Sequence, residues 1–326
     1  MSSSKRFFGI VILLALIAAP FVVWRQWNAI YDWSRLRDYS PPADVVSLAD
    51  QDTFNAYTKH LFYVNHPQLL STVTSFRQYC PENENTIVLG CYHPDQDGIY
   101  IYNVQDPSLA GVAQVTAAHE VLHSIYARLS TKDRAALDSE LQDYYQNDLH
   151  DQRVLAEVAL YQQTEPNSVM DEMSCTFGTE IASLPSPLEA YYSRYFNNRQ
   201  AIVAFEQNYE GEFTSRTNQI NAYDAQLAAL KQQISNEEST LSAQLNQINS
   251  DRARLDSQRN SGDIGGYNAG VDSFNSEVDS YNSGLNQLQA NISDYNNLVT
   301  TRNSIAGELE TLDQAIDTRL TTQSAQ

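Results

Sequence analysis

The stretch from Ala113 to Leu129, AQVTAAHEVLHSIYARL, contains no glycine or proline and predicts a helix. His119 and His123 stand four residues apart in it, so both imidazoles lie on one helical face and can converge on one metal ion. Glu120 projects beside them, within reach of a water on that metal. Zinc lowers the pKa of such a water towards neutrality, and a nearby carboxylate can then accept its proton. We therefore predict zinc ligands at His119 and His123 and a general base at Glu120.

The HExxH pattern arises by chance in about one chain in a hundred of this length. Chance copies usually fall on solvated helix faces, whereas this one is surrounded by apolar side chains, among them Val115, Val121, Leu122 and Ile125. A buried helix that carries two histidines and a glutamate is costly unless those polar groups are engaged. The surroundings therefore favour a metal site over an accidental match.

A catalytic zinc needs a third protein ligand and an open position. Leu129 stands where HExxHxxGxxH sites carry a third histidine, so we expect an acidic ligand from a later helix. The candidates are Glu157, Glu165, Asp171, Glu172 and Glu180. Glu172 is preferred because its neighbours in DEMSCTFGTE are small and apolar, which suggests a packed face. Glu180 is the alternative, and Asp171 has a shorter side chain that points elsewhere on the helix.

At this point the chain resembles the gluzincin branch of the zincin metallopeptidases. The resemblance rests on HEVLH at 119–123 and on Asp171-Glu172 followed by Phe177-Gly178-Thr179, and it covers about residues 80 to 200. It implies a zincin-like domain that hydrolyses peptide bonds, with zinc bound by the two histidines and Glu172 and with Glu120 as general base. The family often has an acidic residue one turn after the ligand glutamate, orienting a histidine, but Thr176 stands there. The gap from His123 to Glu172 is also longer than in the best-known members.

Two further features concern this site. A tyrosine or histidine usually stabilises the oxyanion in such sites, and five tyrosines could do so: Tyr126, Tyr161, Tyr191, Tyr192 and Tyr195. The sequence does not select one of them, and aromatic core packing is the ordinary role of each. Cys175 lies about one turn from Glu172, where a small buried apolar residue is its expected role.

The segment from Phe7 to Trp24, FFGIVILLALIAAPFVVW, carries no charge. Eighteen residues rise about 27 Å as a helix, close to the hydrocarbon thickness of a bilayer. We therefore predict an uncleaved signal-anchor and a single-pass protein of the cell membrane, with its catalytic domain outside the cell. A cleaved signal peptide is the alternative and would release a soluble peptidase. Ile17 is a poor match for the position three residues before a cut after Ala19.

Two β-branched and aromatic runs, Thr86 to Cys91 and Ile99 to Val104, flank the turn residues HPDQDG at 93–98 and predict a β-hairpin. Cys80 and Cys91 are close in sequence and could pair in an oxidising compartment, with reduced packing cysteines as the alternative. From Leu109 onward the pattern is helical. Helices are expected over about 113–129, 131–146, 151–163 and 168–182, and a long one from Ser186.

Heptad spacing governs the last part of the chain. Apolar residues recur every seven positions from Leu227 to Leu255 and again from Val271 to Val299, and a glycine-rich break, SGDIGG, separates the two arrays. This pattern predicts an antiparallel coiled-coil hairpin. The first array is the weaker one because Glu237 and Gln244 stand at seam positions, so its stability could depend on a partner helix beyond the hairpin.

The fold class predicted is therefore α+β and mainly α. Four segments are expected: a transmembrane signal-anchor over 1–25, a juxtamembrane stalk over 26–50, a zincin-like metallopeptidase domain over 51–200 and a coiled-coil helical hairpin over 201–326. The net charge of −20, from 40 acidic and 20 basic residues, argues against nucleic-acid binding.

The function predicted is zinc-dependent hydrolysis of peptide or protein substrates by a membrane-anchored enzyme. The alternative is a cell-surface scaffold or adhesion protein in which the coiled coil binds a second copy or another protein and the zinc site is structural or degenerate. Glu120 distinguishes the two functions, because a structural zinc needs the histidines but has no use for that carboxylate.

Overall fold

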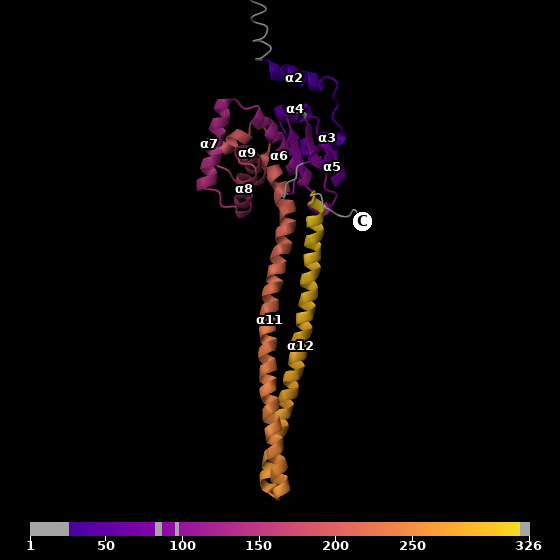
Figure 1. Ribbon diagram of the computed structural model, residues 1–326, viewed down its shortest axis with the longest axis vertical. Coiled ribbons are helices and arrows are strands. Elements are labelled where there is room, and N and C mark those ends of the chain that lie inside the picture. Colours follow the sequence, from indigo (N-terminus) through magenta and orange to yellow (C-terminus); the bar gives the residue numbers. More distant parts are fainter. Residues whose placement is uncertain (1–25, 82–86, 95–97, 320–326) are drawn as a thin grey trace, which may run out of the picture. The chain divides into compact units, whose positions relative to one another are not determined.

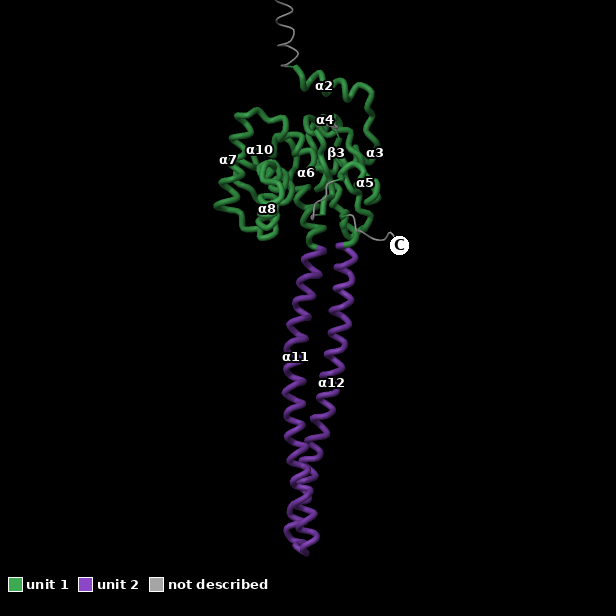
Figure 2. The backbone as a smooth tube through the Cα atoms, viewed as in Figure 1, with its two compact units in different colours: residues 1–211, 314–326 green, residues 212–313 purple. Residues whose placement is uncertain are grey.

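The computed structural model describes residues 26–81, 87–94 and 98–319. The chain forms two compact units, which Figure 2 shows in different colours. The first unit comprises residues 1–211 and 314–326, and the second comprises residues 212–313. Most of the described chain is helical, with one small sheet and a long helical hairpin (Figure 1). The predicted α+β, mainly α class is confirmed at this level.

The sheet of the first unit has three short strands in the order β1-β3-β2. β2 (Gly90–His93) and β3 (Gly98–Tyr102) are antiparallel neighbours, which confirms the predicted hairpin, although β2 begins later than expected. β1 (Gln68–Leu70) pairs in parallel with β3. This strand has only three residues, too few to be recognised from an alternation of apolar and polar side chains. Because β3 is central, β2 forms an edge of the sheet.

Helix α6 (Val112–Ala127) occupies the centre of the first unit and contacts α9 (Val169–Glu180), β2 and β3. Its apolar side chains enter the main core, as expected from the sequence around the HExxH motif. The helix starts after Gly111, whose φ of 113° suits glycine, and a Cβ there would approach the Phe205 carbonyl to 2.9 Å. The motif is therefore held on a helix packed from several sides.

The remaining helices of this part lie close to their predicted positions. α7 (Thr131–Asn147) starts at the Ser130 cap, whose hydroxyl accepts from the Asp133 amide, and α8 (Gln152–Thr164) starts at an Asp151 cap. The prediction of one long helix from Ser186 is wrong. α10 (Ser186–Tyr192) ends after seven residues, and α11 (Arg199–Ser261) begins a separate helix. The chain between them bonds elsewhere, with Asn197 donating to the Thr53 carbonyl.

Four helices precede or flank the sheet: α2 (Trp27–Leu36), α3 (Ala43–Gln51), α4 (Ala56–Val64) and α5 (Val73–Tyr79). α3 contributes Val45, Leu48 and Ala49 to the main core. An ion pair between Asp32 and Arg128, at 2.7 Å, joins α2 to the end of α6. In residues 26–50, predicted as a juxtamembrane stalk, the apolar residues of α3 therefore pack with the rest of the first unit.

The predicted single-pass membrane location needs correction. In residues 26–81, 87–94 and 98–319, no helix is long and apolar enough to span a bilayer. The segment on which that prediction depended, Phe7 to Trp24, lies outside the described residues.

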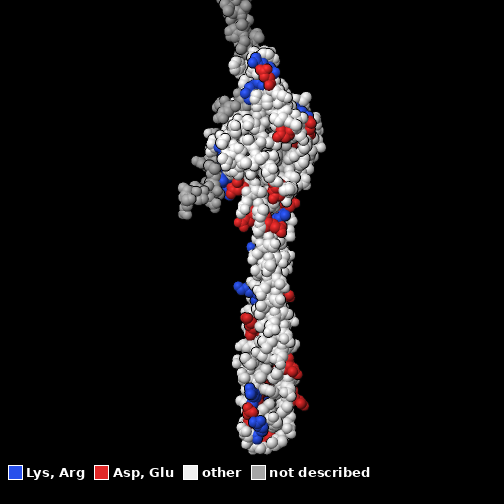
Figure 3. Space-filling view, turned by 90° about the vertical axis from the view of Figure 1, so that its right-hand side faces the viewer, with Lys and Arg blue, Asp and Glu red and all other residues white. Residues whose placement is uncertain are grey.

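The second unit consists of parts of α11 and α12 (Ile264–Ile316), joined through Gly262 and Asp263. Gly262 has a φ of 84°, and Gly265 and Gly266, predicted to break the helix, lie within α12. Asn291 donates to both Glu237 carboxylate oxygens, at 2.7 and 2.8 Å, so this polar seam residue has its partner inside the hairpin. On the face seen in Figure 3, acidic and basic side chains are dispersed among other residues.

Candidate metal centre

α6 carries His119 and His123 one turn apart, with ring centroids 4.9 Å from each other. α9 packs against α6 and places the Glu172 carboxylate opposite both rings. One oxygen of Glu172 lies 3.4 Å from His119 Nε2, and the other lies 3.7 Å from His123 Nε2. Ligand atoms about 2.0–2.2 Å from a tetrahedral zinc are roughly 3.3–3.6 Å apart, so the first of these distances lies within that range and the second is slightly longer.

Asp171 holds the His123 ring from its other side. The Nδ1 of His123 lies 2.9 Å from an Asp171 carboxylate oxygen. A proton on Nδ1 that is donated to Asp171 leaves the Nε2 lone pair directed at a metal, which is the arrangement that metal-binding histidines usually have. The sequence suggested Asp171 only as a less suitable zinc ligand, and the resemblance placed the orienting acid one turn after Glu172, where Thr176 stands. Adjacent side chains on one helix thus reach opposite edges of the same imidazole.

The electrostatics of the group favour positive charge between the two histidines. Burial works against protonation of His119, yet its hydrogen bond to Glu172 raises its pKa overall. The pKa of His123 is likewise raised despite burial, by the charge of Glu172 and by the hydrogen bond to Asp171. Burial opposes ionisation of Glu172, but the two histidines lower its pKa overall. A bound dication satisfies the same preference for positive charge.

Glu120 is 5% exposed, and none of the described residues donates a hydrogen bond to its carboxylate. Burial raises its pKa. It lines a cavity of about 420 Å³ together with His119, His123 and Glu172. A buried carboxyl group without a protein partner is costly unless a ligand or water satisfies it. Its position on the cavity wall supplies space for such a molecule.

Gly90 of the edge strand β2 makes room for this carboxylate. A Cβ at residue 90 would lie 2.5 Å from both Glu120 Oε1 and Thr116 Cγ2. Gly90→Ala is therefore expected to displace the Glu120 side chain and to lower the free energy of unfolding by about 1–3 kcal/mol. Chemical denaturation of the two proteins measures this loss, and Gly307→Ala, at an open helical position, is the control for helix-glycine replacement. Equal stability of Gly90→Ala and wild type would contradict the close approach.

The other acidic ligand candidates line the same cavity but are engaged differently. Glu180 accepts from Arg153 at 2.6 Å, so it is held by a guanidinium rather than by the histidines. Glu157 lies 3.8 Å from the same guanidinium and accepts from Thr176 at 3.4 Å. Glu165 also contributes to the wall. Among the described residues, Glu172 is the candidate whose carboxylate faces both histidines.

Of the five tyrosines named from the sequence, Tyr161 lines the cavity, and its hydrogen bond helps to lower the pKa of Glu172. The Tyr126 hydroxyl donates to Asp138, and that of Tyr192 donates to the Ser174 carbonyl. Tyr191 and Tyr195 pack against each other in the core. Tyr209, from the start of α11, lines the cavity and was missed, because the helical sequence there gives no sign of a site.

Cys175 approaches the site, and its sulfur could join His119 and His123 around an ion. The thiol is fully buried, lies 3.9 Å from Asp171 Oδ1 and is absent from the cavity wall. Burial also raises the pKa of the thiol, which opposes formation of the thiolate that zinc requires. For an ion with an open position towards the cavity, Glu172 is therefore a more suitable third ligand than Cys175.

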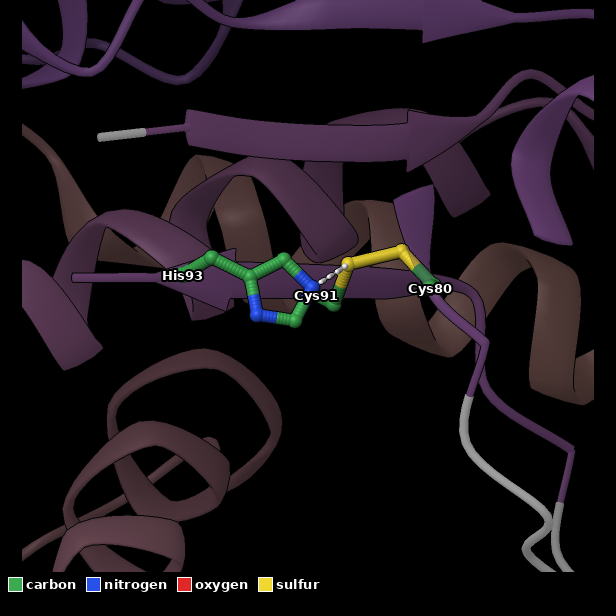
Figure 4. A group of neighbouring side chains, drawn as sticks. All are labelled: Cys80, Cys91 and His93. Carbon is green, nitrogen blue, oxygen red and sulfur yellow. Dashed lines mark hydrogen bonds between the residues drawn. A yellow bond between two sulfur atoms is a disulfide. The ribbon is translucent and has the colours of Figure 1, made fainter. Parts of the chain in front are cut away.

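A second group of metal-ligand residues comprises Cys80, Cys91 and His93, shown in Figure 4. The two cysteines form a disulfide bond, which settles the pairing that the sequence left open. His93 Nε2 lies 2.7 Å from the Tyr79 carbonyl and 3.2 Å from Cys91 Sγ. Because metal binding needs free thiolates, this group serves as a covalent link between α5 and the edge strand β2.

No protein-family model matches this chain, and no curated protein or solved structure shows significant similarity to it. The case for a function therefore depends on the site itself.

Proposed function

We propose that this protein is a zinc-dependent peptidase of the zincin type. The observation that carries the proposal is the distance of 3.4 and 3.7 Å between one Glu172 carboxylate and the Nε2 atoms of His119 and His123. These three side chains would hold the zinc, and Asp171 would orient His123. Zinc at this position would polarise a water molecule and the carbonyl of the scissile bond.

The protein groups around the ion have distinct tasks in this proposal. Glu120 takes a proton from the attacking water and returns it to the leaving amine. Its burial raises the pKa of the carboxyl group towards the range in which it can both accept and release that proton. Tyr161 is on the cavity wall and its hydroxyl is hydrogen-bonded to Glu172, so it helps to hold that carboxylate in its charged form.

A scaffold with a structural zinc is the competing function. Structural zinc sites are closed by four protein ligands, whereas the proposed zinc ligands here line a cavity. The buried carboxylate of Glu120 stands beside them, and a structural zinc site has no need of it. Both features favour catalysis. The helical hairpin of the second unit is then an accessory part, for which we propose binding to a second copy or to another protein.

The test is hydrolysis of a mixture of unrelated peptides by the purified full chain, followed by mass spectrometry. We expect the zinc-loaded protein to cleave peptides. The activity should disappear after treatment with a chelator and return when zinc is added. A structurally intact, zinc-loaded protein that cleaves none of the peptides would contradict the proposal.

Asp171→Asn provides a graded test of the same site. The amide can still contact His123 but no longer carries the charge that raises the basicity of the ring. Zinc affinity is expected to fall about 10- to 100-fold. Competition with a chromophoric chelator measures it, and Asp138→Asn, an acid that contacts Tyr126 instead, is the matched control. Unchanged zinc affinity would remove Asp171 from the metal centre.

A further inference from the structure

Side chains from α8, α9 and the start of α11 form part of the wall of this cavity. Glu157, Glu165 and Glu180 line this wall together with Tyr161 and Tyr209. Neither lysine nor arginine is among the described residues that line the cavity. The wall is thus both acidic and aromatic, and these two features together suit a cationic ligand.

Two acids of this wall, Glu157 and Glu180, share one cation with Glu206, a carboxylate outside the wall. Arg153 contacts three carboxylates, with distances of 2.6 Å to Glu180, 2.6 Å to Glu206 and 3.8 Å to Glu157. One guanidinium therefore serves three acids.

Glu120 supplies an independent indication that the cavity receives a ligand. This side chain is more than nine-tenths buried, faces the cavity and accepts no hydrogen bond from the described residues. The volume of about 420 Å³ also lies within the range of small-molecule and side-chain pockets. The acidic wall is therefore part of a cavity with room for a ligand rather than a solvated surface cluster.

We propose that this wall binds the cationic side chain of a lysine or arginine in the peptide substrate, near the bond to be cleaved. The inference rests on the proposed peptidase function and names its substrate class. Glu157 is the principal partner because its carboxylate has the weakest contact with Arg153. Tyr161 and Tyr209 line the same cavity and are the aromatic residues proposed to contact that charge.

The experiment measures binding separately from hydrolysis. The zinc-loaded full chain carrying Glu120→Gln is titrated with fluorescent peptides that are blocked at both ends and identical except for one central lysine, arginine, norleucine or glutamate. Lysine and arginine peptides are expected to bind on the order of tenfold more tightly than the norleucine peptide. Adding Glu157→Gln should remove most of this difference. Glu140→Gln, an exposed acid on α7, is the control of equal charge and should preserve it.

Equal binding of the lysine and norleucine peptides would overturn the inference, whether or not the wild type cleaves peptides. So would a preference that Glu157→Gln and Glu140→Gln reduce alike, because bulk negative charge would then explain it. A preference that depends on Glu157 in a protein that cleaves nothing would keep the cation site and reject the peptidase function.

Discussion

Glu120→Gln is expected to lower the rate of peptide hydrolysis about a thousandfold while the protein keeps its zinc. The amide has nearly the same shape as the carboxylate but cannot accept the proton of the attacking water. Glu120 is not a zinc ligand in the proposed site, because that role is assigned to Glu172 and the two histidines, whose side chains lie close together. The loss should therefore appear in kcat, with zinc stoichiometry unchanged.

The measurement is the initial rate of cleavage of a quenched fluorescent peptide, with zinc content determined on the same samples. Glu140→Gln makes the same chemical change at an exposed site on α7 and should retain the wild-type rate. A Glu120→Gln protein that holds zinc and cleaves at more than a tenth of the wild-type rate would remove Glu120 from the role of general base.

Phe177→Ala is expected to cost about 3–5 kcal/mol of unfolding free energy, the usual cost of deleting a buried phenyl ring. Phe177 is fully buried on α9, and its ring meets that of Tyr144 edge-on at 5.4 Å. α9 also carries Asp171 and Glu172, so a cavity beneath it loosens the helix that completes the metal centre.

Urea unfolding measures the loss of unfolding free energy. Hydrogen exchange in peptides from α6 and α9 shows whether that loss lies within the first unit. Phe177→Leu keeps most of the apolar volume and should cost less than half as much. A cost below about 1 kcal/mol for the alanine variant would show that this part of the core is not packed as described.

Helix positions were largely predictable because their signals are local. The absence of glycine and proline around HEVLH and the helical pattern of the residues after it place α6, α7 and α8 within about two residues of their observed bounds. The Ser186 start was also found, but the early end of α10 was not. That end depends on bonds from residues 195–197 to residues 53–55, which are distant in sequence.

In the site, too, local features were predictable from the sequence, whereas contacts between distant segments were not. Spacing within one helix predicts that His119 and His123 share a face, and the structure places Glu172 opposite them. The contact of Asp171 with the second edge of His123, and the contributions of Glu157 and Tyr209 to the wall, depend on how α6, α8, α9 and α11 pack. The packing of these helices leaves no periodic pattern in the sequence, so the roles of these residues could not be predicted from it.

The zinc content of the full chain, compared with that of His123→Ala and Glu172→Ala, tests the central claim most directly. The account predicts about one zinc per chain in the wild type and its loss, or a greatly weakened affinity, in both variants. If Glu172→Ala kept its zinc while His123→Ala lost it, the third ligand would be a residue other than Glu172. A wild-type protein that binds no zinc, even after reconstitution, would contradict the metal centre and the function built on it.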